Sequence, residues 1–403
     1  MYLDFVTDYN ALYESYLRIR SVSGWKDSVQ KIGINLLPEL HKLREQILAG
    51  YVPDEQTTFT ICERGHLRLV RALKQEDMMI QHTLCQSVLI PILSRYLIHD
   101  NGASLTGKGI AFTRRRFEQH LSWHYRRYGR EGYVLKIDFK KYFDNIDHAK
   151  LLRAMAEKIP DKALIEMIRS ILASNCPDVS YDTRSIDELM DVPFSSLDHA
   201  KIPHVQLTKQ KYLPKSLGIG SPLSQIAGIF YPTRIDNYCK TVKGLHCYDA
   251  YMDDRIIIHP DKQYLRDLLS EIDAVAREMG LFIHPHKTQI VKLSHGVTFL
   301  KTKYSLTETG HIVRRIPRET VVRERRKLKA LARMAADGKF TLEKFDQQYQ
   351  SWRGDRKRYD AHWMLTNMDN LYRRLRQWLL QQKKSEKQSS GSSKRPSTCG
   401  ATS

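Results

Sequence analysis

The sequence predicts an α+β protein whose strands lie in the middle of the chain, between helical ends. Apolar residues recur at helical spacing near the N-terminus, as at Leu40, Leu43 and Ile47, and again after Pro317. Residues 133–139 and 248–259 instead contain the short apolar runs typical of strands. With 403 residues, the chain is long enough for two or three domains, each with its own core.

Basic residues are concentrated at the C-terminal end of the chain. The whole sequence carries 65 Lys and Arg against 45 Asp and Glu, a formal net charge of +20. Residues 311–403 hold 23 of these basic residues and only 9 of the acidic ones, with tyrosines and tryptophans interleaved. A basic segment rich in aromatic residues favours a nucleic acid over a membrane as the partner.

Several classes of protein are disfavoured by the same sequence. No run approaches the ~18 apolar residues of a membrane span, and the acidic N-terminus lacks the order of a secretory signal. Six cysteines without a C-x-x-C pair disfavour a zinc site and a disulfide framework. We therefore expect a soluble, cytoplasmic protein with no membrane partner.

The other elements follow from local patterns. Helical periodicity predicts helices over residues 1–50, 77–97, 146–175 and 262–279, and throughout the segment after Pro317. Strand pairs are predicted over residues 57–72 and near residues 281–304. Residues 101–109 are predicted to form a loop before an arginine-rich helix, and residues 176–216 to be irregular. The low-complexity segment 383–403 is predicted to be disordered.

Three carboxylates form a candidate site. Asp138 follows an apolar strand, and Asp253 and Asp254 lie between two apolar runs, which predicts a hairpin with both acids at its turn. If Asp138 ends the neighbouring strand, the like charges come close enough to require a cation. Oxygen ligands favour Mg²⁺, with Mn²⁺ as the alternative. Two such ions ~3.5–4 Å apart suit the attack of a hydroxyl on a phosphate.

Five ordered sequence blocks resemble those of reverse transcriptases. Two are acidic, at residues 136–146 (KIDFKKYFDNI) and 251–254 (YMDD). The others are residues 68–71 (RLVR) with 77–82 (DMMIQH), 280–288 (GLFIHPHKT) and 296–301 (GVTFLK). The resemblance covers roughly residues 60–305. It implies a right-hand polymerase: an N-terminal helical region with fingers over 1–130, a palm with an antiparallel sheet over 131–310, a helical basic thumb over 311–382, and a tail over 383–403.

The resemblance also implies roles for particular residues. Asp138, Asp253 and Asp254 would hold the two metal ions, with the backbone carbonyl of Phe139 assisting. Phe143 would occupy the space that a ribose 2′-OH needs, which selects deoxynucleotides; a core aromatic is the alternative.

Three basic residues complete the implied site. Arg68 and Arg71 would contact the phosphates of the incoming nucleotide, for which the guanidinium fork is suited, with surface ion pairs as the alternative. Lys287 would donate a proton to pyrophosphate, or simply be solvated.

The block between the two acidic ones departs from the common pattern. Many reverse transcriptases have Gln-Gly-x-x-x-Ser-Pro there, whereas this chain has Ile219, Gly220 and, at the last position, Gln225. This form resembles the reverse transcriptases of diversity-generating retroelements, relatives of the group II intron type, which copy a template RNA with errors at adenines. Ile219 cannot hydrogen-bond near the nucleotide, so error-prone copying is a hypothesis. An antiphage-defence or other unclassified bacterial reverse transcriptase is the alternative.

The implied partners are a template RNA, a DNA or RNA primer and dNTPs, with an accessory protein or a structured noncoding RNA as further candidates. RNA-primed RNA synthesis and a non-catalytic RNA-binding protein on a polymerase scaffold are the rival functions. Within the basic C-terminal helices, Trp352, Trp363 and Trp378 are predicted to be core residues of the thumb, with base-stacking platforms as the alternative.

Overall fold

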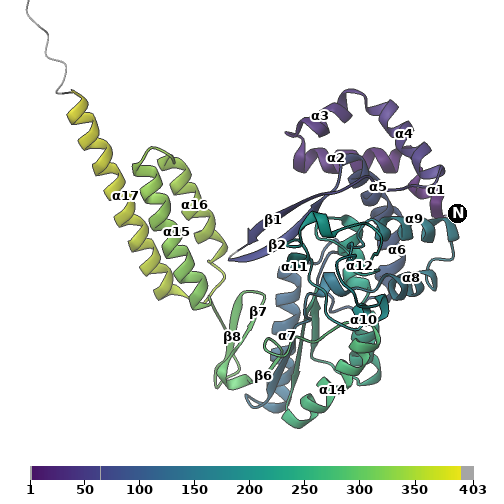
Figure 1. Cartoon of the computed structure of the whole chain (residues 1–403). Coiled ribbons are helices and arrows are strands. Elements are labelled where there is room, and N and C mark those ends of the chain that lie inside the picture. The colour runs from purple at the N-terminus through teal and green to yellow at the C-terminus, as the bar shows by residue number, and fades with distance from the viewer. Residues whose placement is uncertain (1, 64, 392–403) are drawn as a thin grey trace, which may run out of the picture. The chain divides into compact units, whose positions relative to one another are not determined.

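The computed structural model describes residues 2–63 and 65–391, which divide into two compact units (Figure 1). Unit 1 contains the chain up to residue 128 and residues 132–291. Unit 2 contains residues 129–131 and the chain from residue 292. No helix in the described part of the chain is long and apolar enough to cross a membrane.

Unit 1 begins with four helices, as the apolar spacing predicts. They are α1 (Tyr2–Val6), α2 (Tyr9–Ser23), α3 (Asp27–Ile34) and α4 (Leu36–Leu48). The Asp8 side chain caps α2 by accepting a hydrogen bond from the Ala11 N–H. Leu40, Leu43 and Ile47 of α4 are buried in the core of unit 1, so the apolar positions found in the sequence do define the inner face of this helix.

An exposed hairpin follows, which confirms the strand pair predicted for residues 57–72. Strands β1 (Thr57–Glu63) and β2 (His66–Ala72) pair antiparallel, with Thr57 opposite Ala72.

The next helical segment is broken, where the sequence predicted one helix over 77–97. It consists of α5 (Gln75–Leu84), the π-helical turn η1 (Cys85–Leu89), α6 (Ile90–Leu93) and the 3₁₀ turn η2 (Ser94–Tyr96). The Ile90 N–H bonds to the Cys85 carbonyl, five residues back. Pro91 has no N–H to continue the α-helical ladder, which explains why the bonding pattern changes here.

The central sheet of unit 1 has the strand order β4-β5-β3-β6. Its strands are β3 (Tyr133–Ile137), β4 (Tyr248–Tyr251), β5 (Asp254–His259) and β6 (Gln289–Lys292). Strand β5 pairs antiparallel with both β3 and β4, so the two segments that carry the predicted acids are neighbours in the sheet. Helices α7 (Ile110–Tyr128) and α14 (Lys262–Glu278) pack against these strands.

Further helices surround the sheet and confirm most of the remaining predictions for unit 1. Residues 146–175 contain α8 (His148–Ala156) and α9 (Lys162–Ala173) after the 3₁₀ turn η3 (Tyr142–Asn145). Residues 176–216 are largely irregular, with only short turns of helix: α10 (Ile186–Met190), α11 (Ser196–His199) and η4 (His204–Gln206). Then come α12 (Pro222–Phe230), α13 (Thr233–Asn237) and the π-helical η5 (Tyr238–Val242).

Unit 2 combines a small sheet with three helices. Strands β7 (Val297–Phe299), β8 (Thr302–Leu306) and β9 (Ile312–Arg315) pair in that order, after the short turn η6 (Leu293–His295). The strand pair predicted near 281–304 is thus confirmed only for its later part. Residues 281–288 contribute one isolated bridge, between Ile283 and Phe139.

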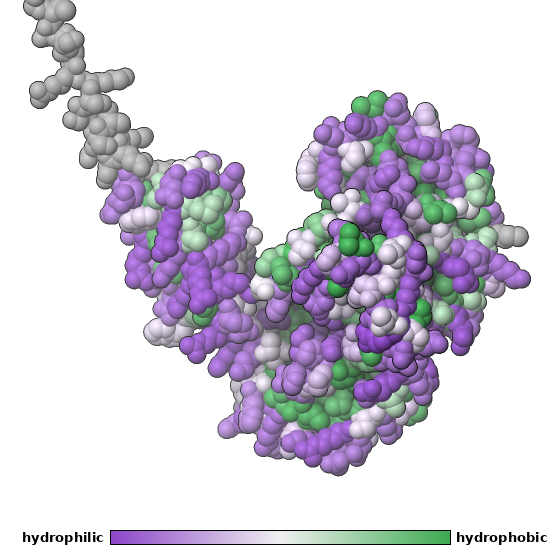
Figure 2. Space-filling view, in the orientation of Figure 1, coloured by the Kyte–Doolittle hydropathy of each residue, from purple (hydrophilic) through white to green (hydrophobic). Residues whose placement is uncertain are grey.

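The segment after Pro317 is helical, as predicted. Helices α15 (Arg318–Ala336), α16 (Leu342–Asp355) and α17 (His362–Gly391) run side by side (Figure 1). They enclose a core of their own that includes Leu328, Phe345 and Met368, and their visible surface is largely hydrophilic (Figure 2).

Two predictions for this region are wrong in part. Helix α17 continues through residues 383–391, which the sequence predicted to be disordered, because the Lys, Glu and Gln residues there are good helix formers; residues 392–403 lie outside the described part of the chain. Trp363, predicted to be a core residue, is 81% exposed, because it lies at the start of α17, ahead of the buried Met368 and Leu379. Trp352 does pack against the core, and Trp378 is 37% exposed.

Candidate active site

The pairing of the strands brings Asp138, Asp253 and Asp254 to one end of the sheet. Tyr251 is paired with Asp254, so Met252 and Asp253 form a two-residue turn in which Met252 has a positive φ of 53°. Ile137 is paired with Arg255. Asp138, the next residue, therefore comes opposite Asp254.

The three carboxylates lie close enough for the charge of one to affect the pKa of another. Burial raises the pKa of Asp253 above its ordinary 3.8, and the negative charge of Asp138 raises it further. Burial also raises the pKa of Asp254, with Lys136 opposing the shift and both other acids adding to it. The Asp253 and Asp254 carboxyls thus resist ionisation, first because they are buried and then because other acids lie close by, which is the situation that a bound cation relieves.

Two lysines lie beside these acids. The Lys136 Nζ is 3.6 Å from Asp254 Oδ1, and the Lys287 Nζ is 3.5 Å from Asp138 Oδ1. The Lys287 side chain is 63% exposed and extends from the segment that forms the Ile283 bridge with Phe139. Residues of the two acidic blocks and of the 280–288 block therefore converge, although the first acidic block lies more than a hundred positions before the other two.

The donor set fits a divalent cation. Asp138 Oδ1 is buried and has no hydrogen-bond partner in residues 2–63 and 65–391. The backbone of Asp138 is fixed on both sides: its N–H donates to Thr288 Oγ1 at 3.2 Å, and its carbonyl accepts from the His284 N–H at 2.8 Å. A carboxylate oxygen that makes no hydrogen bond, only the 3.5 Å ion pair with the exposed Lys287, suits Mg²⁺ or Mn²⁺ when it lies on a fixed backbone beside two more carboxylates.

A buried ion pair contacts the Met252–Asp253 turn, and the sequence analysis did not find it. Arg255 is 1% exposed and forms an ion pair with Asp236, Nε to Oδ1 at 3.2 Å. The Tyr248 hydroxyl donates to the same Asp236 oxygen at 2.6 Å. Arg255 also donates to the Met252 carbonyl in the turn, and its guanidinium lies 5.5 Å from the centre of the buried Phe139 ring. The sequence did contain a signal for this ion pair, since Arg255 stands next to a run of isoleucines in a predicted strand.

Phe143 lies against helix α12. Its ring is half-buried, and a Cβ at Gly228 would come within 2.9 Å of Phe143 Cε1, so only glycine leaves room for the ring in this position. The backbone carbonyl of Phe143 accepts from the Leu217 N–H at 3.0 Å, which ties it to the loop before Ile219.

That loop also contacts the β1–β2 hairpin. The Arg71 N–H donates to the Ile219 carbonyl at 2.9 Å. Gly220 has φ = 133°, and a Cβ there would come within 2.4 Å of the Arg71 carbonyl oxygen. Glycine is therefore required by both the backbone conformation and the close approach. Ile219 is half-buried and Gln225 is exposed.

The two predicted phosphate-binding arginines differ in their surroundings. Arg71 donates from Nη1 to the Asn175 carbonyl at 2.9 Å, and burial lowers its pKa. Arg68 instead forms an ion pair with Glu63 at 3.3 Å, in which both side chains are about half exposed. The structure thus brings Arg71 to the loop of Ile219, whereas Arg68 is found in the surface ion pair that the sequence analysis named as its alternative.

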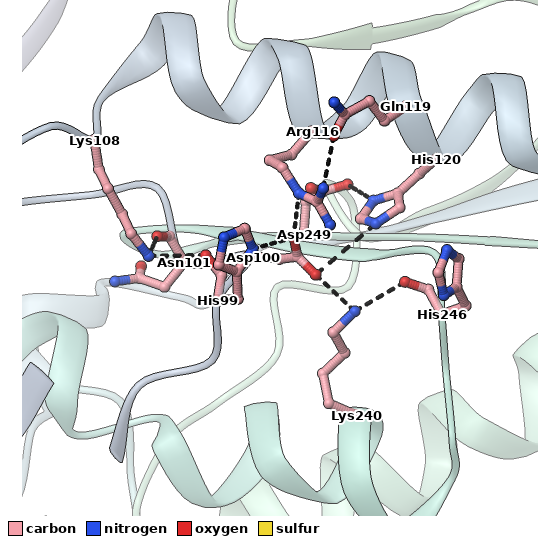
Figure 3. Close-up of polar contacts among 10 residues, drawn as sticks. All are labelled: His99, Asp100, Asn101, Lys108, Arg116, Gln119, His120, Lys240, His246 and Asp249. Atoms are coloured by element: carbon pink, nitrogen blue, oxygen red, sulfur yellow. Dashed lines mark hydrogen bonds and ion pairs between the residues drawn. The ribbon is translucent and has the colours of Figure 1, made fainter. Parts of the chain in front are cut away.

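A second acidic cluster lies on the other side of the β4–β5 hairpin (Figure 3). Ligand atoms of Asp100, His120 and Asp249 lie within 4.8 Å of one another, and all three residues are buried. Two cations already neutralise Asp100, since Lys240 and Arg116 approach it to 2.7 and 2.6 Å, and Asp249, whose pKa is raised by burial, is hydrogen-bonded to His120 Nδ1 at 2.8 Å. Burial opposes ionisation of Asp100, but the hydrogen bonds from Lys240 and Arg116 lower its pKa to about 2. This charge balance favours an ion-pair network over a metal site.

The network holds the loop before α7 against the sheet. The Ala250 N–H donates to the Asp100 carbonyl at 3.2 Å, and the Gly102 N–H donates to the Ala250 carbonyl at 3.0 Å. Farther along the loop, the Ser104 hydroxyl contacts the Met252 sulfur at 3.8 Å. Nothing in the sequence marks this cluster, because its members are up to 149 positions apart and belong to separate elements.

Comparison with known proteins agrees with this geometry. The pattern of the family "Reverse transcriptase (RNA-dependent DNA polymerase)" matches residues 83–304, which is more than half of the chain. The chain belongs to the reverse transcriptase family. Its α+β fold, with mixed helices and antiparallel sheets, is the fold of that family. No curated protein matches the sequence as a whole.

Solved structures with some similarity include two yeast telomerases. One is telomerase from Candida albicans in complex with a fragment of telomeric RNA, at 14% identity and a TM-score of 0.41. The other is apo telomerase from Candida tropicalis truncated from the C-terminal domain, at 15% identity and a TM-score of 0.41. The matches cover 68% and 64% of this chain, and it spans only 50% and 55% of theirs.

The raised pKa of Asp253 predicts that this residue destabilises the metal-free protein. A carboxyl whose pKa is raised by folding binds its proton more tightly in the folded state, so stability falls as the pH rises from the ordinary value through the raised one. In EDTA at about pH 8, Asp253→Asn is expected to raise the melting temperature, and the gain should shrink near pH 4. Added Mg²⁺ should stabilise the wild type more than the variant.

Asp337→Asn is the matched control, because Asp337 is an exposed residue at the end of α15. Its melting temperature should follow that of the wild type with and without Mg²⁺. An Asp253→Asn variant that is less stable than the wild type in EDTA would contradict this account of the site.

Proposed function

We propose that the chain is an RNA-directed DNA polymerase that makes cDNA from dNTPs on an RNA template, extending a DNA or RNA primer. The observation that carries the proposal is the convergence of Asp138, Asp253 and Asp254 at one end of a sheet, where Asp138 Oδ1 forms no hydrogen bond within the described residues. The matched family pattern supports the same activity. The fingers would lie within residues 1–130, the palm would span residues 131–310, and residues 311–382 would be the thumb. The palm would thus include residues 132–291 of unit 1 together with β7 and β8 of unit 2.

The three acids would hold two Mg²⁺ ions, with the Phe139 carbonyl as a further ligand. When bound, the ions would activate the primer 3′-hydroxyl and stabilise the leaving pyrophosphate. The protein's part is to keep the carboxylates in place: Arg255 fixes the turn through the Met252 carbonyl, and Thr288 fixes the backbone at Asp138. Lys287, whose Nζ lies 3.5 Å from Asp138 Oδ1, would supply a proton to the pyrophosphate.

Removal of one metal ligand tests the activity. Asp253→Ala should reduce dNTP incorporation on a primed RNA with Mg²⁺ by roughly 10²-fold or more, because each bound ion stabilises the transition state by several kcal/mol. Asp337→Ala is the control and should incorporate at the wild-type rate. If the Asp253→Ala variant is as active as the wild type, the polymerase proposal is wrong. If neither protein incorporates nucleotide but both bind RNA, the non-catalytic RNA-binding function is supported instead.

Phe143 would select deoxynucleotides. Its half-buried ring is held against Gly228, so it has little freedom to move away from a ribose 2′-OH. Phe143→Ala should improve ribonucleotide use relative to dNTP use by roughly 10–10²-fold, the range that a single steric contact provides. The measurement is kcat/KM for NTPs and dNTPs on one template. A wild type that already prefers NTPs would favour RNA synthesis.

We further propose that copying is error-prone, as in diversity-generating retroelements. The Ile219 side chain brings no hydrogen-bonding group to the loop, and its carbonyl is already used by the Arg71 N–H. Ile219→Gln restores the common residue and should lower misincorporation opposite template adenine, measured by sequencing the cDNA. Leu207→Gln in the irregular segment is the control for an added amide. A wild-type error rate that is the same at all four template bases would favour another lineage, such as an antiphage-defence reverse transcriptase.

A further inference from the structure

Unit 2 contains a cavity that the proposed catalytic site does not use. Its volume is about 830 Å³, within the ~300–1,000 Å³ typical of ligand sites. The end of β9, the end of α16, the linker between α16 and α17, and the start of α17 line it. We call it the α16–α17 cavity.

An exposed indole forms part of the wall. Trp363 is 81% exposed, although a large aromatic side chain is normally at least partly covered. It has no stacking or cation–π partner in the described ranges of the chain. Other aromatic residues of unit 2 behave differently: Tyr349 stacks on Tyr372 with 4.2 Å between ring centroids, inside the helical core. The Trp363 ring is therefore free to stack on a ligand.

The same cavity is lined by more basic than acidic side chains. Arg315 and Lys357 form no ion pair with any described acidic residue. Asp369 pairs with Arg353 at 3.0 Å, and the one acid in the lining, Asp360, accepts a hydrogen bond from the Arg314 N–H at 2.9 Å and keeps its charge. The cavity therefore offers two cations without an ion pair in the same lining as the exposed indole.

This combination selects a particular kind of ligand. An apolar ligand would gain nothing from the cations, and an acidic peptide would gain little from the indole. An unpaired nucleotide uses both, because its base stacks on an aromatic ring and its flanking phosphates attract Arg and Lys. A base inside a duplex is already stacked and cannot reach the indole.

We propose that the α16–α17 cavity binds an unpaired nucleotide of a nucleic-acid strand, with its base stacked on Trp363 and its flanking phosphates at Arg315 and Lys357. The proposal rests on the proposed polymerase function only for the choice of a nucleic acid as the partner. It adds a site for unpaired nucleotides to the backbone contacts expected of basic helices.

The test is a binding titration of the full-length protein in EDTA without dNTPs. The probes are an eight-nucleotide A-rich RNA, the DNA of the same sequence, ATP, and a blunt duplex. Trp363→Ala should weaken binding of the single strands by about 5–150-fold, the worth of one base–aromatic stack, and leave duplex binding unchanged. Trp363→Phe should recover most of the affinity. Lys357→Gln should reduce the slope of log K against log salt by roughly 0.7, the value for one lost phosphate contact on a single strand.

Trp25→Ala is the matched control, because Trp25 is 76% exposed in unit 1 and has Lys26 beside its ring at 5.8 Å. It should bind all probes as the wild type does. Weakened binding of either single strand by Trp363→Ala alone supports the site, and the RNA and DNA arms identify which strand it prefers. The proposal is wrong if Trp363→Ala binds normally, if Trp25→Ala is equally impaired, if the duplex is affected as much, or if only ATP is affected. Since no catalysis is measured, a failure here is separate from a failure of the Asp253→Ala test.

Discussion

The sheet of unit 1 holds three carboxylates close together against their mutual repulsion, and this constraint shapes the surrounding structure. Asp138, Asp253 and Asp254 are each only partly exposed, and burial together with like charge raises the pKa of the last two. On a flexible backbone the three carboxylates would move apart. Here the registers of β3 with β5 and of β4 with β5 fix the backbone positions from which all three side chains extend. The site therefore stores an electrostatic cost that a divalent cation would relieve.

Two buried ionic groups hold this arrangement from opposite faces of the β4–β5 hairpin. Arg255 and Asp236 lie on one face, and the cluster of Asp100, His120 and Asp249 lies on the other. Such pairs contribute little net stability, because desolvation offsets most of their attraction. The ionic groups nevertheless favour a single arrangement of the turn, because a buried charge must stay next to its partner. Arg255 reaches the turn through the Met252 carbonyl, and the Asp100 segment reaches it through Ser104. Buried charge thus defines the position of the turn that carries Asp253.

The loop around Ile219 connects this centre with the β1–β2 hairpin. Gly220 allows the backbone of Arg71 to approach closely, and the Arg71 N–H donates to the Ile219 carbonyl. Phe143 contacts the same region through Leu217 and Gly228. A substitution in this loop would therefore act on Phe143 and on the β1–β2 hairpin together.

The sequence alone determined the order of the elements and the identity of the acids. Helical and strand periodicities are local, so the N-terminal helices, the β4–β5 hairpin and the helices after Pro317 were predictable. Trp363 and the π-helical turn at Cys85–Leu89 were not, because exposure and bonding pattern depend on what packs nearby. Only the tertiary structure decided that Lys287 lies beside Asp138 and that Asp100 meets Asp249. Those contacts join distant parts of the chain, and Coulomb and hydrogen-bond interactions act over a few ångströms in space, whatever the separation in sequence.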